Sequence, residues 1–326
     1  MRPHLDRRTW LGAALALAAA PRAGGAQGRR VARIAFVSWF APSETGQIEP
    51  LREGLRALGW VEGRTLELDV RFTEGDAERT RRAIADALAR PVDVLVVRAT
   101  NVAHLAKEAT ATTPIVMLVS DPLATGLVKS LARPEGNLTG LSLQGPDLAG
   151  KRLEYLSAMM PGLRTVGFLG ASNDPNVSTF VRETQAAADR MGVELKVRLV
   201  PGVRAFGEAD VAALAAERVQ ALLVQPIFTG QHARIVELAM QRRIAVISNY
   251  AVFAQAGGLL AYGPDDAAST RRAAWFVHRL LNGAKPGDLP VEQPSRFTLA
   301  INVTTAKALG LSVPAGLMTS ADLVVE

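Results

Sequence analysis

The chain has 326 residues, of which 48% are hydrophobic and 21% are charged, and it contains no cysteine. This composition excludes a disordered chain, and the lack of cysteine excludes disulfides, thiolate nucleophiles and zinc sites built on cysteine. The net charge of +6 falls to +3 without residues 1–26, which hold four arginines and one aspartate. So mild a charge, without a stripe of basic residues interleaved with aromatic ones, argues against nucleic acid as a partner.

Residues 1–26 are typical of an export signal. A charged start with Arg7 and Arg8 is followed by the apolar stretch Trp10–Ala20 and by the small residues Gly24-Gly25-Ala26. The order predicts secretion to the periplasm and cleavage after Ala26, and the arginine pair resembles the twin-arginine motif, with the general secretory route left open. No later apolar stretch approaches the roughly 20 residues of a membrane span, so the mature chain is not expected to insert into the membrane.

The remaining sequence alternates strand-like and helix-like segments and does so twice in the same order. This pattern is typical of an α/β protein, and with this length it predicts two similar doubly wound parallel-sheet lobes. The first five predicted strands are 31–40, 65–74, 92–99, 115–121 and 137–144. The corresponding strands of the second half are, in the same order, 164–171, 194–202, 221–226, 245–250 and 258–263.

Three segments rich in glycine and proline link the predicted lobes and indicate a three-segment hinge: 145–147, 263–265 and 290–294. After the second link, residues 267–281 read as an amphipathic helix that returns to the first lobe. After the third, a strand at 297–303 and a helix at 304–309 complete the second lobe. The predicted division is therefore 31–144 plus 265–290 for the N-terminal lobe and 146–262 plus 291–326 for the C-terminal lobe.

Polar residues follow two neighbouring predicted strands at the point where each ends. Thr100 and Asn101 follow the strand at 92–99, and Ser120 and Asp121 follow the apolar run 115–119. In an open α/β sheet, ligands bind in the crevice beyond the carboxyl ends of the strands. Capping of the following helices is the competing interpretation for Thr100, Asn101 and Asp121.

The sequence has no complete motif for phosphate binding, metal binding or catalysis. The segment GPDLAGKR at 145–152 departs from a phosphate-binding P-loop, because Arg152 stands where the P-loop requires Ser or Thr and Pro146 removes an amide. The three histidines that follow the export signal have no second histidine or carboxylate at ligand spacing. We therefore expect no metal, no cofactor and no catalytic residue.

The predicted strand ends of both lobes would instead surround a cleft that suits a small molecule. Aromatic walls supply apolar contact there, and hydroxyls, amides and carboxylates fix the orientation. For Trp39, Phe228 and Tyr250, ordinary packing is the competing interpretation. The candidate ligand-binding residues are Ser38, Trp39, Thr100, Asn101, Asp121, Asn173, Asp174, Pro226, Phe228, Asn249 and Tyr250.

The sequence resembles the solute-binding components of ABC importers, in the tryptophan-receptor-like group of the type I periplasmic binding protein fold. The resemblance rests on stretches that together cover most of residues 31–326. They include SDPLATGLVKSLARPEGNLTGLS at 120–142, FAQAGGLLAYG at 253–263 and LPVEQPSRFTLAINVTTAKALGLSVP at 289–314. It implies a receptor that closes on a solute and delivers it to membrane permease subunits, with contacts at Thr100, Asn101, Asp121 and Asn173. The segment Arg98-Ala99-Thr100-Asn101 departs from the small residues and glycines that relatives often have there.

The polar residues of the cleft also suggest what the solute carries. A carboxylate in a closed cleft must be paired, and the nearest basic residue at this rim is Arg98, so an amine of the ligand is a fitting partner for Asp121 or Asp174. A carboxylate or carbonyl would contact Thr100, Asn101 and Ser38. The alternative is that Asp121 only caps a helix beginning near Pro122.

Our first interpretation is therefore a monomeric binding protein for an amino acid or a related amine-bearing metabolite. An α/β enzyme acting on a similar metabolite and a ligand sensor subunit are the alternatives.

Overall fold

A computed structural model describes residues 31–42 and 48–326, and residues 31–326 form one compact unit. The predicted export signal therefore lies outside the described residues. None of the helices in the described part of the chain is long and apolar enough to cross a membrane.

The first half of this unit forms a five-stranded parallel sheet in the order β2-β1-β3-β4-β5. Apolar runs without alternation predict strands that are buried on both faces, and every residue of β1, β3, β4 and β5 is buried. The strands are β1 (Ala32–Ser38), β2 (Leu66–Phe72), β3 (Val94–Arg98), β4 (Ile115–Val119) and β5 (Leu138–Ser142).

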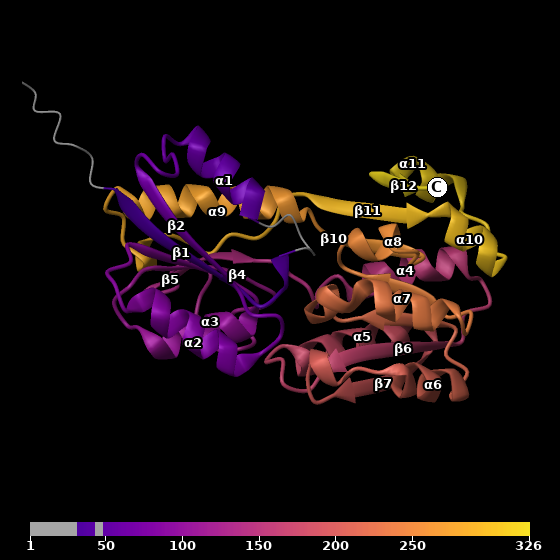
Figure 1. Ribbon diagram of the computed structural model, residues 1–326. Helices are drawn as coiled ribbons and strands as arrows, with labels where there is room; N and C mark the ends of the chain where they lie inside the picture. The colour runs from indigo at the N-terminus through magenta and orange to yellow at the C-terminus, as the bar shows by residue number, and fades with distance from the viewer. Residues whose placement is uncertain (1–30, 43–47) are drawn as a thin grey trace, which may run out of the picture. The chain divides into compact units, whose positions relative to one another are not determined.

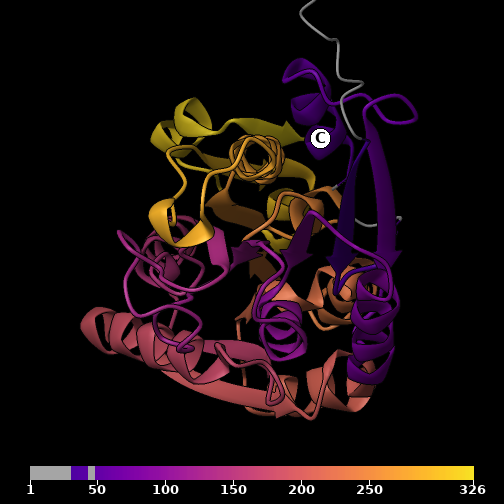
Figure 2. The ribbon, with the colours of Figure 1, turned by 90° about the vertical axis from the view of Figure 1, so that its left-hand side faces the viewer.

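Helices cover both faces of this sheet. Ile34 and Phe36 pack with α1 (Ile48–Ala57) and α9 (Asp266–Leu281), whereas Ala35 and Val37 pack on the opposite face with α2 (Ala77–Leu88) and α3 (Thr100–Ala109). Figures 1 and 2 show α9 on one side of the sheet and α2 and α3 on the other. We call this sheet with α1, α2, α3 and α9 the first lobe.

The second sheet has seven strands in the order β12-β11-β10-β9-β8-β6-β7, parallel except for the antiparallel pair β10 and β11. We call it, with its helices, the second lobe. Its strands are β6 (Thr165–Ala171), β7 (Glu194–Val200), β8 (Ala221–Val224), β9 (Ala245–Ser248), β10 (Leu260–Pro264), β11 (Phe297–Asn302) and β12 (Leu323–Val325). Its helices are α4 (Ala149–Met159), α5 (Val177–Met191), α6 (Glu208–Ala216), α7 (His232–Met240), α8 (Val252–Gln255), α10 (Val303–Leu309) and α11 (Ala315–Ser320), with the 3₁₀ turns η2 (Val203–Ala205) and η3 (Pro226–Gln231).

The predicted fold class is confirmed, and each predicted strand has a counterpart. The helix predicted at 267–281 is α9, capped by the carboxylate of Asp265, which accepts a hydrogen bond from the Ala268 amide (2.9 Å). The segment 145–152 runs into α4, which begins at Ala149. Two elements at the end of the chain, α11 and β12, were not predicted.

The chain passes between the two lobes three times: between β5 and α4, between β10 and α9, and between η4 (Pro286–Asp288) and β11. Arg152 of α4 ties the first two passages together, because its Nε donates to the Tyr262 carbonyl (2.9 Å) and its Nη2 to the Gly145 carbonyl (2.8 Å). At the third passage, the amide of Glu292 still donates to Gly140 of β5 (2.9 Å). The predicted lobe boundaries stay a prediction.

Candidate functional site

The carboxyl ends of the strands in the two lobes face each other around a small central cavity of about 20 Å³. Ala99, Thr100 and Ser120 contribute to its wall from the first lobe, and Asp174 and Pro226 from the second. The volume is that of one water molecule, so a solute would need the neighbouring space as well.

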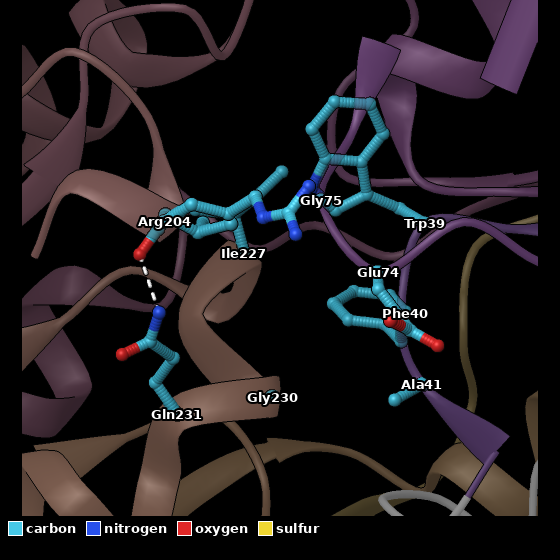
Figure 3. A pocket seen from close by; sticks show the side chains of 10 residues that line it. Trp39, Phe40, Ala41, Glu74, Gly75, Arg204, Ile227, Gly230 and Gln231 are labelled. Atoms are coloured by element: carbon cyan, nitrogen blue, oxygen red, sulfur yellow. Dashed lines mark hydrogen bonds between the residues drawn. The ribbon is translucent and has the colours of Figure 1, made fainter. Parts of the chain in front are cut away.

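A larger cavity of about 240 Å³ lies next to the central one and shares Phe40 and Ile227 with it. We call it the Trp39 cavity. Figure 3 shows Trp39, Phe40 and Glu74 on one side of it, with Arg204 and Gln231 on the other. Gln231 is fixed by a hydrogen bond from its Nε2 to the Val203 carbonyl (2.5 Å).

A third cavity of about 300 Å³ shares Arg98 and Tyr250 with the central one. We call it the Arg98 cavity. It lies where the end of β9, the start of α9 and the start of α1 meet, and its polar wall includes Asn249, Asp266 and Thr298. The three cavities form a row across the interface between the lobes, because each flanking cavity shares two residues with the central one.

Buried polar atoms without a hydrogen-bond partner are concentrated around these cavities. Such atoms are rare in proteins because each costs free energy. Within residues 31–42 and 48–326 they are Trp39 Nε1, Arg98 Nε, Asn101 Oδ1, His104 Nε2, Asn176 Oδ1, Gln225 Nε2 and Asn249 Oδ1. All except His104 belong to residues at the ends of strands or in the first turn that follows, and Trp39, Arg98 and Asn249 line the cavities themselves.

Arg98 is the most unusual of these residues, because it is a charged side chain that is only 2% exposed at the end of a buried strand. Its Nη1 donates to Thr270 Oγ1 (3.1 Å), its Nη2 pairs with the carboxylate of Asp266, and its guanidinium lies 5.8 Å from the centre of the Phe40 ring. Desolvation acts to lower the pKa of Arg98, but Asp266 and Tyr250 outweigh it, so the pKa is raised.

Asp174 places a second titratable group beside the central cavity. Burial raises the pKa of its carboxyl to about 6, although the backbone amide of Asn176, which donates to Oδ1 (2.7 Å), acts in the opposite direction. Desolvation likewise raises the pKa of the Tyr250 hydroxyl to about 12, against the effect of Arg98. Charged forms are therefore costly in this region unless a partner is present.

Two contacts join the lobes across the site. The Asn176 side chain of the second lobe donates to Thr100 Oγ1 of the first lobe (2.6 Å), and both residues are buried. At the Trp39 cavity, Arg204 of η2 pairs with Asp76, the residue that caps α2 (2.9 Å). These contacts hold the two sets of strand ends against each other.

The structure brings several of the predicted ligand-binding residues to this row of cavities and leaves others out. Trp39, Thr100, Asp174, Pro226, Asn249 and Tyr250 line it. Ser38 and Asn101 are buried nearby, Phe228 is buried against Phe206, and Asn173 is exposed.

Asp121 lies apart from these cavities. Its Oδ1 accepts hydrogen bonds from the amides of Leu123 (3.0 Å) and Ala124 (2.9 Å), and it is not among the residues that line the three cavities. The alternative interpretation placed a helix near Pro122, but the segment folds as turns up to Gly126, which has a φ of +70°. The carboxylate therefore satisfies the amides of a turn.

Sequence reasoning missed three residues of the site. Asp266 was not among the candidate residues, although it pairs with Arg98 across 168 positions of the chain. Arg204 and Gln231 stand on 3₁₀ turns that no periodic pattern marks. Arg98 carried a signal, since a charge within the apolar run 94–98 is costly unless it has a purpose.

Two α/β lobes and three connecting passages define the type I periplasmic binding protein fold, which is also seen in known solute-binding proteins. Over residues 30–325 the sequence matches the family of ABC transporter substrate binding proteins, and the chain belongs to this family. The family consists of solute-binding proteins, not enzymes.

Similar proteins agree with this assignment. A tyrosine-binding protein of Clostridioides difficile is 23% identical over 264 residues, covering 79% of this chain and 75% of that protein. An ABC domain of Streptococcus pneumoniae in complex with L-Trp is 26% identical, with a TM-score of 0.84 over 90% of this chain and 99% of that one. A conserved domain protein of Vibrio cholerae is 24% identical, with a TM-score of 0.84 over 90% and 100% of the two chains.

Proposed function

We propose that this protein is an extracytoplasmic receptor that captures an amino acid or a related amine-bearing metabolite between its lobes and delivers it to an ABC importer. The observation that carries the proposal is the set of buried polar atoms at the facing strand ends that have no hydrogen-bond partner in the described part of the chain. A protein maintains such atoms at a cost in stability, and a bound solute would satisfy them. The relatives named for tyrosine and for bound L-Trp support an amino acid as the class of solute.

The test is to identify what the protein binds and whether it changes. Protein purified without denaturation is analysed by mass spectrometry for a co-purifying metabolite, and the twenty amino acids are screened for a shift in melting temperature. We expect a shift with at least one amino acid, which is recovered intact. A lack of any shift or of any co-purifying amine would contradict the amino acid, and consumption of the ligand would contradict a receptor.

The three connecting passages suggest how the two lobes would close on the solute. We propose that lobes of residues 31–144 plus 265–290 and 146–262 plus 291–326 rotate about these passages and bury the solute. Small-angle scattering of the monomer should show a smaller radius of gyration with a saturating ligand. An unchanged radius at saturation would contradict closure without contradicting binding.

Export is the remaining part of the proposal. The basic, apolar and small-residue order of residues 1–26 supports periplasmic secretion and cleavage after Ala26. Intact-mass analysis of the exported protein should give a chain that begins at Gln27. A mature chain that retains Trp10 would contradict cleavage, and unimpaired export after Arg7→Lys and Arg8→Lys together would contradict the twin-arginine route.

A further inference from the structure

The residues that line the Arg98 cavity include one charged donor, Arg98, one side-chain amide, Asn249, and two carboxylates, Asp265 and Asp266. Arg98 Nε and Asn249 Oδ1 are both buried without a hydrogen-bond partner among the described residues, and both residues line the cavity. Arg98 is 2% exposed and Asn249 is 4% exposed. The Asp266 side chain is 29% exposed, and the polar wall also includes Thr229, Asp265 and Thr298.

The bonds that Arg98 already makes fix how a ligand can approach it. Nη1 and Nη2 are directed to Thr270 and Asp266 on α9, so the orientation of the guanidinium plane is set before any ligand binds. Nε is left for an acceptor, and a carboxylate is the acceptor that matches guanidinium geometry and charge. Asn249 Oδ1 requires the opposite, a ligand that donates a hydrogen bond.

The charge of the cavity matches a ligand that carries both signs. Arg98 contributes a positive charge and Asp266 a negative one, and these groups pair with each other. The second carboxylate of the wall, Asp265, accepts a hydrogen bond from the Ala268 amide as the cap of α9. A ligand with only one charge would oppose one member of the pair, whereas a zwitterion complements both. The wall also includes Pro50, Val252 and Pro264, which suit a hydrophobic side chain.

We propose that the Arg98 cavity holds the head group of an α-amino acid. The carboxylate accepts from Arg98 Nε, and the ammonium donates to Asn249 Oδ1 and to the carboxylate of Asp266. This inference rests on the proposed function and deepens it, because it assigns the head group to residues other than Asp121, Thr100 and Ser38. Arg98 then sets the specificity for a free carboxylate.

The test pairs changes in the protein with changes in the ligand. Isothermal titration calorimetry measures binding of L-tryptophan, L-tyrosine and the other amino acids to the wild type, and the best of them is compared with its methyl ester and its N-acetyl derivative. The same three ligands are titrated into Arg98→Met and Asp266→Asn. Arg271→Met is the matched control, since Arg271 is an exposed arginine of α9 that pairs with Glu53.

We expect the ester to bind the wild type roughly 10- to 100-fold more weakly than the amino acid, the range of a lost charge-assisted hydrogen bond. In Arg98→Met this difference between acid and ester should nearly vanish, because the residue that recognises the carboxylate is gone. In Asp266→Asn the penalty for N-acetylation should shrink instead. Arg271→Met should bind all three ligands as the wild type does.

Other outcomes separate the two proposals. If the wild type binds an amino acid but Arg98→Met loses acid and ester equally, or loses neither, the head-group assignment is overturned and the receptor function stands. If the wild type binds none of the amino acids, both are overturned. If Arg98→Met does not fold, Arg98→Lys replaces it, and the ligand comparison in Asp266→Asn decides the assignment. An N-acetyl derivative that binds Asp266→Asn with the same loss of affinity as it shows with the wild type would overturn the assignment.

Discussion

The Arg98 cavity and the Trp39 cavity lie on either side of the same central cavity, but they hold their charges differently. In the first, the Arg98 side chain is 2% exposed and pairs with Asp266 within one lobe. In the second, the Arg204 side chain is 64% exposed and pairs with Asp76 of the other lobe. One site contains a buried charge of fixed geometry, and the other an exposed charge that pairs across the two lobes.

This difference indicates two different tasks. A buried charge discriminates strongly among ligands because leaving it unpaired is costly, and this suits recognition of the solute. An exposed pair is screened by water and salt, and this suits a weak contact that forms and breaks as the lobes move. Substitutions on the buried side should therefore have large effects, and those on the exposed side small ones that depend on salt.

The largest effect is expected at Arg152, which is buried like Arg98. Its two hydrogen bonds join the Gly145 and Tyr262 carbonyls of two connecting passages, and burial lowers its pKa to about 9, so it remains charged at neutral pH. Arg152→Ala leaves both carbonyls without this donor and should destabilise the protein by roughly 3–5 kcal/mol. Urea unfolding measures the change.

Arg271→Ala is the control for Arg152, since it removes an exposed arginine and should change stability by under about 0.5 kcal/mol. A loss of less than about 1 kcal/mol in Arg152→Ala would mean that water replaces the guanidinium easily. Burial of a charged side chain would then not predict the size of its effect on stability in this region, and the contrast between the two cavities would no longer be justified.

Asp174, between the two cavities, should make stability depend on pH. Its folded pKa of about 6 lies above the ordinary value of 3.8, so the folded state keeps a proton that the unfolded state loses. Stability from this group is therefore present below about pH 4 and is lost as pH rises through 6. Asp174→Asn, which does not titrate, should be more stable than the wild type by up to about 3 kcal/mol at pH 8 and nearly equal at pH 4.

Urea unfolding of both proteins at pH 4, 6 and 8 tests this expectation. Asp189→Asn, which changes an exposed aspartate of the same lobe, provides the control and should follow the wild type across the range. A difference between Asp174→Asn and the wild type that does not grow with pH would show that Asp174 reaches solvent.

The fold was predictable from the sequence because its signals are local. The run 115–119 is apolar throughout and forms a strand buried on both faces, and Asp265 caps α9 as an aspartate before a helix should. The strand β12 was missed because it has only three residues, and its pairing with β11 defines it more than its own composition does.

The sequence predicted where the site lies in the fold, but not which contacts its side chains make. Parallel strands bring their carboxyl ends to one edge, so Thr100, Asp174 and Tyr250 could be placed around one cleft from their order in the chain. What each side chain contacts depends on distant residues. The pairing of Arg98 with Asp266 spans 168 positions of the chain, and the hydrogen bonds that Asp121 accepts depend on the turn that follows it.

A smaller effect is expected at Ala99, which opens α3 at the central cavity with φ of +89° and ψ of 149°. This conformation is strained for a residue with a Cβ and unstrained for glycine. Ala99→Gly should therefore stabilise the protein by about 1 kcal/mol, after the greater entropy of glycine in the unfolded state is counted. Thermal unfolding measures it, with Ala109→Gly at the end of α3 as a control that should destabilise. Destabilisation by both would show that Ala99 is not strained.

The smallest effect is expected from Arg204→Met, on the exposed side of the site. The pair with Asp76 crosses between the lobes, so its loss should favour the open form and weaken solute binding, but only by about 2- to 3-fold because water screens the charges. The decisive measurement is the salt dependence. Between 20 and 500 mM NaCl the wild type should lose this small advantage and converge on the variant, whereas the penalty of Arg98→Met should persist because a buried charge is screened far less. A loss above about 10-fold in Arg204→Met, insensitive to salt, would show that Arg204 contacts the solute directly, and the two cavities would then share the task of recognition.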